Sequence, residues 1–138
     1  MSEKEYILTM NTKQAREVMN ALEAIFRWKL KQPNIMREYL PDRLDWENDF
    51  DASLAKRKGA DDLLKAANDL LIPYDFGDSK PLKDEQWHRI YNIYQTIRHA
   101  IQQAEYPDSK GVDSYPVYPS GSEPLPGIEW RESEARRK

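Results

Sequence analysis

The chain has 138 residues, of which 39% are hydrophobic and 33% are charged, and its formal net charge is -3. This balance suits one water-soluble domain and gives no global positive field that would draw the protein onto nucleic acid or an anionic membrane. Cysteine is absent, which excludes disulfides, thiolate nucleophiles and cysteine-ligated metal centres.

The lack of cysteine and the charged start of the chain, Met1 to Glu5, together predict a cytoplasmic protein without a secretory signal. No stretch approaches the ~18 apolar residues that would span a bilayer, so we expect no membrane partner. A chain of this size gains stability by self-association, and a homo-oligomer is therefore one expected state.

The first expected element is a short β-prone run from Tyr6 to Met10. Asn11 is a good helix N-cap, and Gln14 follows three residues later as in a capping box. A first helix is therefore expected, ending before Pro33 because proline cannot continue it. Apolar residues at helical spacing mark its core face: Ala15, Val18, Met19, Leu22, Ile25, Phe26 and Leu30.

A second long helix is predicted from about Ala52 to Leu71, after an irregular stretch with a short helix at 35–40. Gly59 weakens its middle by ~1 kcal/mol relative to alanine. The apolar side of this helix is expected to face the core and consists of Ala60, Leu63, Leu64, Ala67, Leu70 and Leu71.

The third long helix is expected to open at Ser79 and Pro81 and to end near Glu105. It supplies the most continuous core stripe of the chain: Trp87, Ile90, Tyr91, Tyr94, Ile97 and Ile101. Beyond Glu105 lie five of the nine prolines and three of the five glycines, so this tail is not helical for most of its length.

The expected fold is mostly α, with three main helices and a small β element that pairs Tyr6–Met10 with Ile128–Trp130. A single domain spans 1–138: a helical core with its N-terminal strand at 5–104, a Pro/Gly-rich tail at 105–130 packed on that core, and a frayed end at 131–138. The tail residues expected to pack are Val112, Tyr115, Val117, Tyr118, Leu125, Ile128 and Trp130.

No Gly-rich phosphate loop, nucleophile elbow or metalloprotease motif occurs, so we expect no enzyme, no cofactor and no metal site. The two histidines, His88 and His99, project the same way from one helix, but at 1.5 Å per residue they lie ~16 Å apart, too far to share a metal. A small hydrolase that uses a few carboxylates and a histidine stays a minor alternative.

Two cations fall on apolar helix faces: Arg98 lies between Trp87 and Tyr91, and Lys29 lies within the arc of the first helix's core face. Such a charge must snorkel to solvent, pair with a carboxylate or receive an anionic ligand. Snorkelling is favoured for Lys29, whereas an internal carboxylate and an external anion both stay open for Arg98. The candidate ligand-binding residues are Arg98, Arg27, His99, Tyr91 and Lys29.

Three segments in this order carry a resemblance: Ala21 to Gln32, Ile97-Arg98-His99, and Gly111-Val112-Asp113 with the later run Pro124 to Glu129. Together they resemble a family of small uncharacterised bacteriophage and prophage proteins. Arg27 and Gln32 match an Arg and a Gln of that family near the end of its first helix, whereas Lys31 stands where the family often has Gly. The resemblance implies phage origin, the host cytoplasm and a helical fold with a small sheet, but no established activity.

These features predict a non-enzymatic phage accessory protein, with a role in counter-defence, that sequesters a small anionic, nucleotide-like ligand through Arg98 and Arg27. The alternative is an interaction module that blocks or adapts a host protein through its Tyr- and Pro-rich tail. Nucleic-acid binding is not expected, because the basic run Lys56-Arg57-Lys58 points in several directions on a helix.

Overall fold

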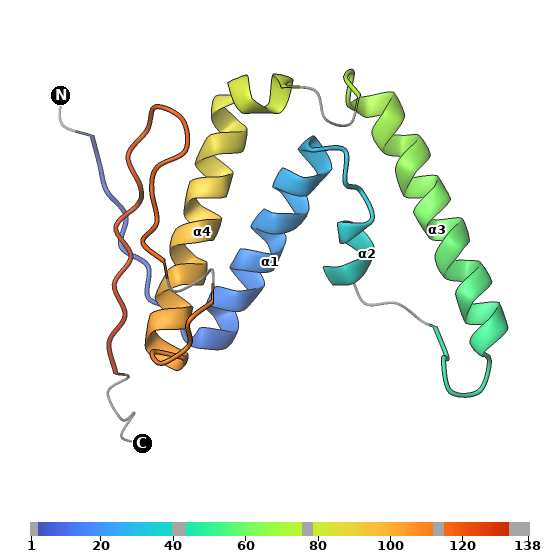
Figure 1. Ribbon diagram of the computed structural model, residues 1–138, viewed down its shortest axis with the longest axis horizontal. Coiled ribbons are helices and arrows are strands. Elements are labelled where there is room, and N and C mark those ends of the chain that lie inside the picture. The colour runs from blue at the N-terminus through green and yellow to red at the C-terminus, as the bar shows by residue number, and fades with distance from the viewer. Residues whose placement is uncertain (1–2, 40–43, 76–78, 112–114, 133–138) are drawn as a thin grey trace.

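The structure is a computed structural model, and it describes residues 3–39, 44–75, 79–111 and 115–132. Its elements in chain order are α1 (Thr12–Lys29), α2 (Ile35–Tyr39), α3 (Phe50–Leu71), the 3-10 helix η1 (Lys80–Lys83) and α4 (Glu85–Glu105). The mostly helical fold class is confirmed. α1 packs against α4, α2 lies against α1, and α3 stands apart from the α1–α4 pair, beyond α2 (Figure 1).

α1 begins where the sequence predicts. The Asn11 side chain accepts from the Gln14 backbone N–H at 2.8 Å, and the Gln14 side chain accepts from the Asn11 N–H at 3.0 Å. This reciprocal pair is the predicted capping box. α1 ends at Lys29, before Pro33 as predicted. Lys31, two residues after the end of the helix, adopts a φ of 65°, in the left-handed region that residues with a Cβ rarely adopt.

α4 begins later than predicted, because Ser79 and Pro81 open η1 instead. The N-cap of α4 is Asp84, whose Oδ1 accepts from the N–H groups of Gln86 at 2.9 Å and Trp87 at 3.3 Å. The fixed φ of proline suits a 3-10 helix as well as an α-helix, so Pro81 alone does not separate the two.

The hydrophobic core lies between α1 and α4. Phe26 of α1 meets Trp87 and Tyr94 of α4 edge-on, with ring centroids 6.2 and 4.9 Å apart. Trp87 Nε1 also donates to the Phe26 carbonyl at 3.1 Å, which satisfies the indole inside the core. The half-buried side chains that complete this cluster are Met19, Leu22, Leu30, Ile90 and Tyr91, so the stripe predicted for α4 does face the core.

The buried face of α1 is rotated from the predicted one. Val18 and Ile25 are exposed, whereas Glu23 is buried. At 100° per residue Glu23 lies beside Leu30 and Met19, on the side of α1 that meets α4. A carboxylate is costly in such a place unless it has hydrogen-bond partners, and the other helices supply them here.

α3 begins at Phe50, two residues before the predicted start, and ends at Leu71 as predicted. Of its predicted apolar side, Leu64 and Ala67 are half-buried, whereas Leu63, Leu70 and Leu71 are exposed. Its buried residues are Ser53 and Asn68, whereas the side of Leu63, Leu70 and Leu71 is 70–86% exposed. The expectation that these leucines face the core is therefore wrong. Helical periodicity reveals that an apolar face exists, but it does not say which element covers that face.

Polar contacts join the inner side of α3 to α1 and α2. Asp61 accepts from Arg37 Nε of α2 at 2.7 Å, and Asn68 Nδ2 donates to the Trp28 carbonyl of α1 at 2.9 Å. These contacts fix the rotation of α3 about its own axis. The short helix predicted at 35–40 is α2, and position 40 lies outside the described residues.

The described residues contain no strand, so the predicted pairing of Tyr6–Met10 with Ile128–Trp130 is wrong. A β-prone run becomes a strand only where a neighbouring strand supplies backbone partners. Neither segment forms such a pair in the described part of the chain, and Ile7 is 98% exposed.

The tail contacts α4 through polar side chains. The buried Asn92 binds the backbone of Ser120 in both directions: Nδ2 donates to the carbonyl at 2.9 Å and Oδ1 accepts from the N–H at 2.8 Å. Gln95 Nε2 donates to the Tyr118 carbonyl at 2.9 Å, and His88 Nδ1 lies 2.6 Å from Ser120 Oγ. The backbone of the tail is thereby held at residues 118–120.

Several apolar tail residues do not pack as expected. Tyr115, Tyr118 and Trp130 are more than half exposed, whereas Val117, Leu125 and Ile128 are half-buried. The polar side chains of α4 position the backbone and leave these aromatic rings outside. Val112 and the expected frayed end beyond residue 132 lie outside the described residues.

Candidate functional site

The predicted ligand-binding arginines lie around a buried carboxylate that sequence reasoning did not single out. Glu23 Oε2 accepts from the Tyr94 hydroxyl at 3.0 Å and lies 3.4 Å from Arg27 Nε, while Oε1 accepts from the Tyr39 hydroxyl. One carboxylate of α1 therefore binds groups of α1, α2 and α4. Charge-assisted hydrogen bonds of this kind compensate for the burial of the charge.

Arg98 joins this cluster through Tyr94. Its Nη1 donates to the Tyr94 hydroxyl at 3.3 Å, and its guanidinium lies 5.1 Å from the centre of the same ring. Burial raises the pKa of Tyr94, and the neighbouring Glu23 raises it further, although Arg98 acts in the opposite direction. The hydroxyl therefore stays protonated near neutral pH and donates to Glu23 while accepting from Arg98.

The other predicted cations also have partners within the chain. Arg27 Nη1 donates to Gln32 Oε1 at 2.7 Å, in addition to its contact with Glu23. Lys29 Nζ forms an ion pair of 2.7 Å with Asp84, the N-cap of α4, instead of extending to solvent as expected. The hydrogen bond from Lys29 holds the pKa of Asp84 below its usual value.

The two remaining candidates differ in their surroundings. Tyr91 stacks on Trp87 with ring centroids 5.1 Å apart and planes 8° apart, so its ring belongs to the core. His99 is half-buried on α4, directly after Arg98 in the chain. The structure thus brings Arg27 and Arg98 to one cluster, and it places the ammonium group of Lys29 against Asp84, the N-cap of α4.

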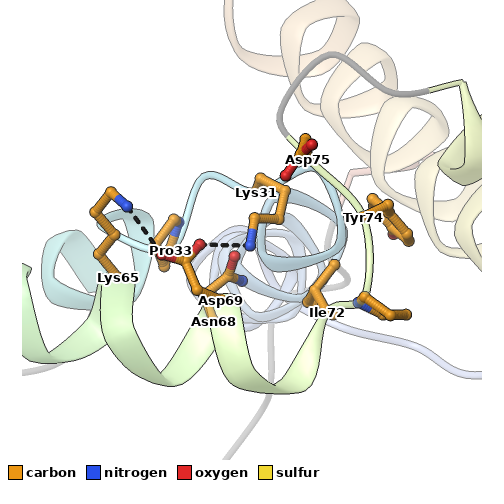
Figure 2. Close-up of a pocket in the computed structure, with 9 residues that line it drawn as sticks. Lys31, Pro33, Lys65, Asn68, Asp69, Ile72, Tyr74 and Asp75 are labelled. Atoms are coloured by element: carbon orange, nitrogen blue, oxygen red, sulfur yellow. Dashed lines mark hydrogen bonds and ion pairs between the residues drawn. The ribbon is translucent and has the colours of Figure 1, made fainter.

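A pocket of about 490 Å³ opens between the end of α1, the second half of α3 and the residues that follow α3 (Figure 2). In its wall Asp69 accepts from two lysines: Lys31 Nζ contacts Oδ1 at 2.6 Å and Lys65 Nζ contacts Oδ2 at 2.9 Å. The hydrogen bonds from Lys31 and then Lys65 lower the pKa of Asp69 to about 2. The remaining wall is formed by Pro33, Asn68, Ile72, Pro73, Tyr74 and Asp75.

Asn68 is the most buried side chain of this pocket, with 0% exposure. Its Nδ2 donates to the Trp28 carbonyl, which fixes the orientation of the amide because a carbonyl oxygen faces only a donor. The opposite atom, Oδ1, has no hydrogen-bond partner among the described residues. A buried acceptor left in this way costs ~1–3 kcal/mol, and with less than 1 Å² of accessible surface this oxygen is enclosed by protein atoms and does not face the open pocket.

Sequence reasoning missed this pocket. Its residues come from α1, α3 and the connection after α3, and no periodicity or motif joins positions so far apart in the chain. Lys31 in its wall has a φ of 65°, the left-handed backbone that favours glycine, and the residue type alone does not indicate this conformation.

Comparisons of the chain with protein-family models, curated proteins and solved structures found no match. The resemblance to phage proteins therefore stays a prediction. In the part of the chain that the structure describes, no helix is both long and apolar enough to span a membrane. The same residues contain no group of three or more histidines and carboxylates arranged to hold a metal ion.

Proposed function

We propose that this protein is a non-enzymatic interaction module that binds a partner protein through the outer face of α3. We define this face by Gly59, Leu63, Ala66 and Leu70, all of which are exposed. They follow one another at spacings of four, three and four residues, which is the spacing of a helix–helix contact. The observation that carries the proposal is the exposure of Leu63 (74%) and Leu70 (86%) at this spacing.

The composition of this face indicates a helix as the partner. Gly59 has open space where a Cβ would lie, and Ala66 adds only a methyl group. Small residues let a second helix approach closely, while leucines between them insert into its grooves. Full burial of each leucine contributes ~1.5–3 kcal/mol to binding before the costs of association.

α3 is held in an orientation that leaves Leu63 and Leu70 exposed, and it cannot rotate to bury them without losing its inner polar contacts. A half-turn about its axis would carry Asn68 away from the Trp28 carbonyl, and Asp61 away from Arg37. The inner polar contacts therefore keep the apolar face directed outward. An apolar stripe held on the surface in this way is typical of a binding site.

The resemblance to phage proteins makes a bacterial host protein the proposed partner, bound in the host cytoplasm and blocked or adapted by the complex. Tyr115 and Tyr118 of the tail form a second exposed surface for such a partner. Capture of a small anion by Arg27 and Arg98 stays a second proposal. It is supported by their convergence on the Glu23–Tyr94 cluster, where a ligand would compete with the internal hydrogen bonds.

The experiment compares purified forms of the protein as baits in a bacterial lysate, followed by mass spectrometry and by calorimetry with the purified captured protein. The baits are the wild type, Leu63→Glu/Leu70→Glu, Gly59→Leu, and the tail control Tyr115→Ser/Tyr118→Ser. We expect one captured protein to be lost with both α3 variants and to be retained by the tail control. Gly59→Leu is informative because the new side chain enters open space in this chain and blocks only a close partner.

Two results would contradict the proposal. The first is that the wild type and the α3 variants capture the same proteins with the same affinity. The other is light scattering that shows a homodimer of the wild type and monomers of both α3 variants, since a second copy would then occupy the outer face. The variants change Gly59, Leu63 and Leu70, three of the four residues that define this face.

A further inference from the structure

We propose that α4 carries a binding site for an extended peptide of the pattern Pro-Ser-Gly-x-Glu, and that the tail of this chain is the resident ligand of that site. A partner peptide of the same chemistry binds there by displacing the tail. The site lies on α4, so it is independent of the outer face of α3.

The site is a polar stripe that runs beside the core stripe of α4. Its members follow one another at spacings of four, three, four and three residues, so they share one side of the helix. A helix packed on this side requires apolar residues at such spacing, whereas side-chain amides suit the N–H and C=O groups of an extended backbone. The members of the stripe are His88, Asn92, Gln95, His99 and Gln102.

The amides of the stripe bind the main chain of the tail. Asn92 donates to the Ser120 carbonyl at 2.9 Å and accepts from the Ser120 N–H at 2.8 Å, and Gln95 donates to the Tyr118 carbonyl at 2.9 Å. Gln95 Nε2 also donates to Asn92 Oδ1 at 3.0 Å, so the two amides orient each other. Every peptide has these main-chain groups, so the contacts do not require that the ligand belong to the same chain.

Three side-chain features select the sequence of the ligand. Ser120 Oγ lies 2.6 Å from His88 Nδ1, and Glu123 forms an ion pair with Arg89. Gly121 between them has a φ of +76°, and a Cβ on it would lie 2.8 Å from the His88 ring. The site therefore accepts Ser, then Gly, and a carboxylate two residues after the Gly.

The tail is attached in a way that allows exchange. Its contacts with the stripe are hydrogen bonds and an ion pair, while the rings of Tyr115 and Tyr118 stay 66% and 74% exposed. A second peptide of the same pattern replaces each of these bonds by an equal one. Pro116 and Pro119 fix φ near the value of an extended polyproline helix, which lowers the entropy lost on binding. Figure 1 shows this part of the tail running alongside α4.

The test is fluorescence anisotropy of a dye-labelled peptide of residues 115–123 with three full-length proteins: the wild type, Gly121→Ala and Gly127→Ala. Gly121→Ala loosens the resident tail and leaves α4 unchanged, so it should bind the peptide about tenfold more tightly than the wild type. Gly127→Ala is the matched control and should bind like the wild type, because a Cβ there meets nothing within 4 Å. A peptide that itself carries Gly121→Ala should bind about tenfold more weakly than the unchanged peptide.

A double-mutant cycle places the peptide on the stripe. In the Gly121→Ala protein, Arg89→Gln should weaken binding about twofold to fivefold, and Glu123→Gln in the peptide should do the same. Both changes together should weaken binding no more than either one alone, because they remove one ion pair. Arg89 is exposed, so its replacement leaves the core of α4 intact.

A further measurement needs no variant. A spin label on the peptide should broaden the side-chain amide NMR signals of Asn92 and Gln95 in the wild type. The proposal is overturned if Gly121→Ala and Gly127→Ala bind the peptide equally, if the effects of Arg89→Gln and Glu123→Gln add, or if the broadening falls away from α4. Leu63→Glu/Leu70→Glu should bind the peptide like the wild type, so failure of the α3 interface leaves this result unaffected.

Discussion

Glu23 of α1 and Tyr94 of α4 are joined by a hydrogen bond of 3.0 Å within the interface of the two helices. The same hydroxyl accepts from Arg98, and the same carboxylate accepts from Tyr39 of α2. A buried polar network of this kind is favourable only when its members are satisfied together. The network also fixes the positions of α1, α2 and α4 relative to one another. Its hydrogen bonds require matched partners, so they specify these positions more closely than apolar packing alone.

The Glu23–Tyr94 pair should therefore be strongly coupled. Glu23→Gln replaces one acceptor oxygen by a donor, and Tyr94→Phe removes the shared hydroxyl. Each variant should lower the free energy of unfolding by ~1–3 kcal/mol. The double variant should lose clearly less than the sum, as a double-mutant cycle by urea denaturation would show. Additive losses would mean that the two side chains do not depend on each other.

Arg98→Met should also destabilise the protein, because Arg98 binds both the hydroxyl and the ring face of Tyr94. We expect a loss of ~1–3 kcal/mol in thermal or urea unfolding. Arg98→Lys should recover only part of it, since an ammonium does not reproduce a planar guanidinium over a ring. A melting temperature of Arg98→Met at or above that of the wild type would instead favour an external anion as the partner of Arg98.

Docking of the tail should depend on Gly121. This residue has a φ of +76°, and a Cβ added there would lie 2.8 Å from the His88 ring. Gly121→Ala should therefore lower the melting temperature and speed proteolysis of the tail, because both the backbone and the contact become strained. Gly127→Ala is the control, since a Cβ there meets nothing within 4 Å. Equal behaviour of the two variants would show that the tail is not held at His88.

The two lysines of the pocket give Asp69 a distinct acid response. Hydrogen bonds from Lys31 and Lys65 lower the pKa of Asp69 from 3.8 to about 2 in the folded chain. A lowered pKa contributes stability that is present above the ordinary value and is lost as the pH falls toward the folded value. The difference in melting temperature between the wild type and Asp69→Asn should therefore shrink from pH 4 to pH 2. A difference that stays constant over this range would contradict the pairing.

The parts of the fold that the sequence predicts are those governed by local chemistry. The capping box at Asn11 and Gln14 forms as expected because it needs only residues three positions apart. The core stripe of α4 is likewise predicted, because Trp87, Tyr94 and Ile97 lie on one side of a regular helix. Such features do not depend on what the rest of the chain supplies.

The parts that the sequence does not predict depend on partners distant in the chain. Glu23 is buried because Tyr39 and Tyr94 bring hydroxyl groups to it, and no periodicity announces those contacts. Asn68 is buried because the Trp28 carbonyl and the end of α1 meet α3 there. Of the candidate site, the sequence therefore identified the arginines but neither the carboxylate between them nor the pocket beside α3.

Leu63 and Leu70 of α3 face outward, where our proposal places a partner helix. The most direct test is the free energy of unfolding of Leu63→Ala and Leu70→Ala in the isolated protein. An exposed leucine should cost less than ~0.5 kcal/mol on truncation, whereas a buried one costs ~2–5 kcal/mol. Phe26→Ala, in the core between α1 and α4, is the reference for a large loss. We predict small losses for both leucines, and a loss of ~2 kcal/mol or more at either would contradict the account.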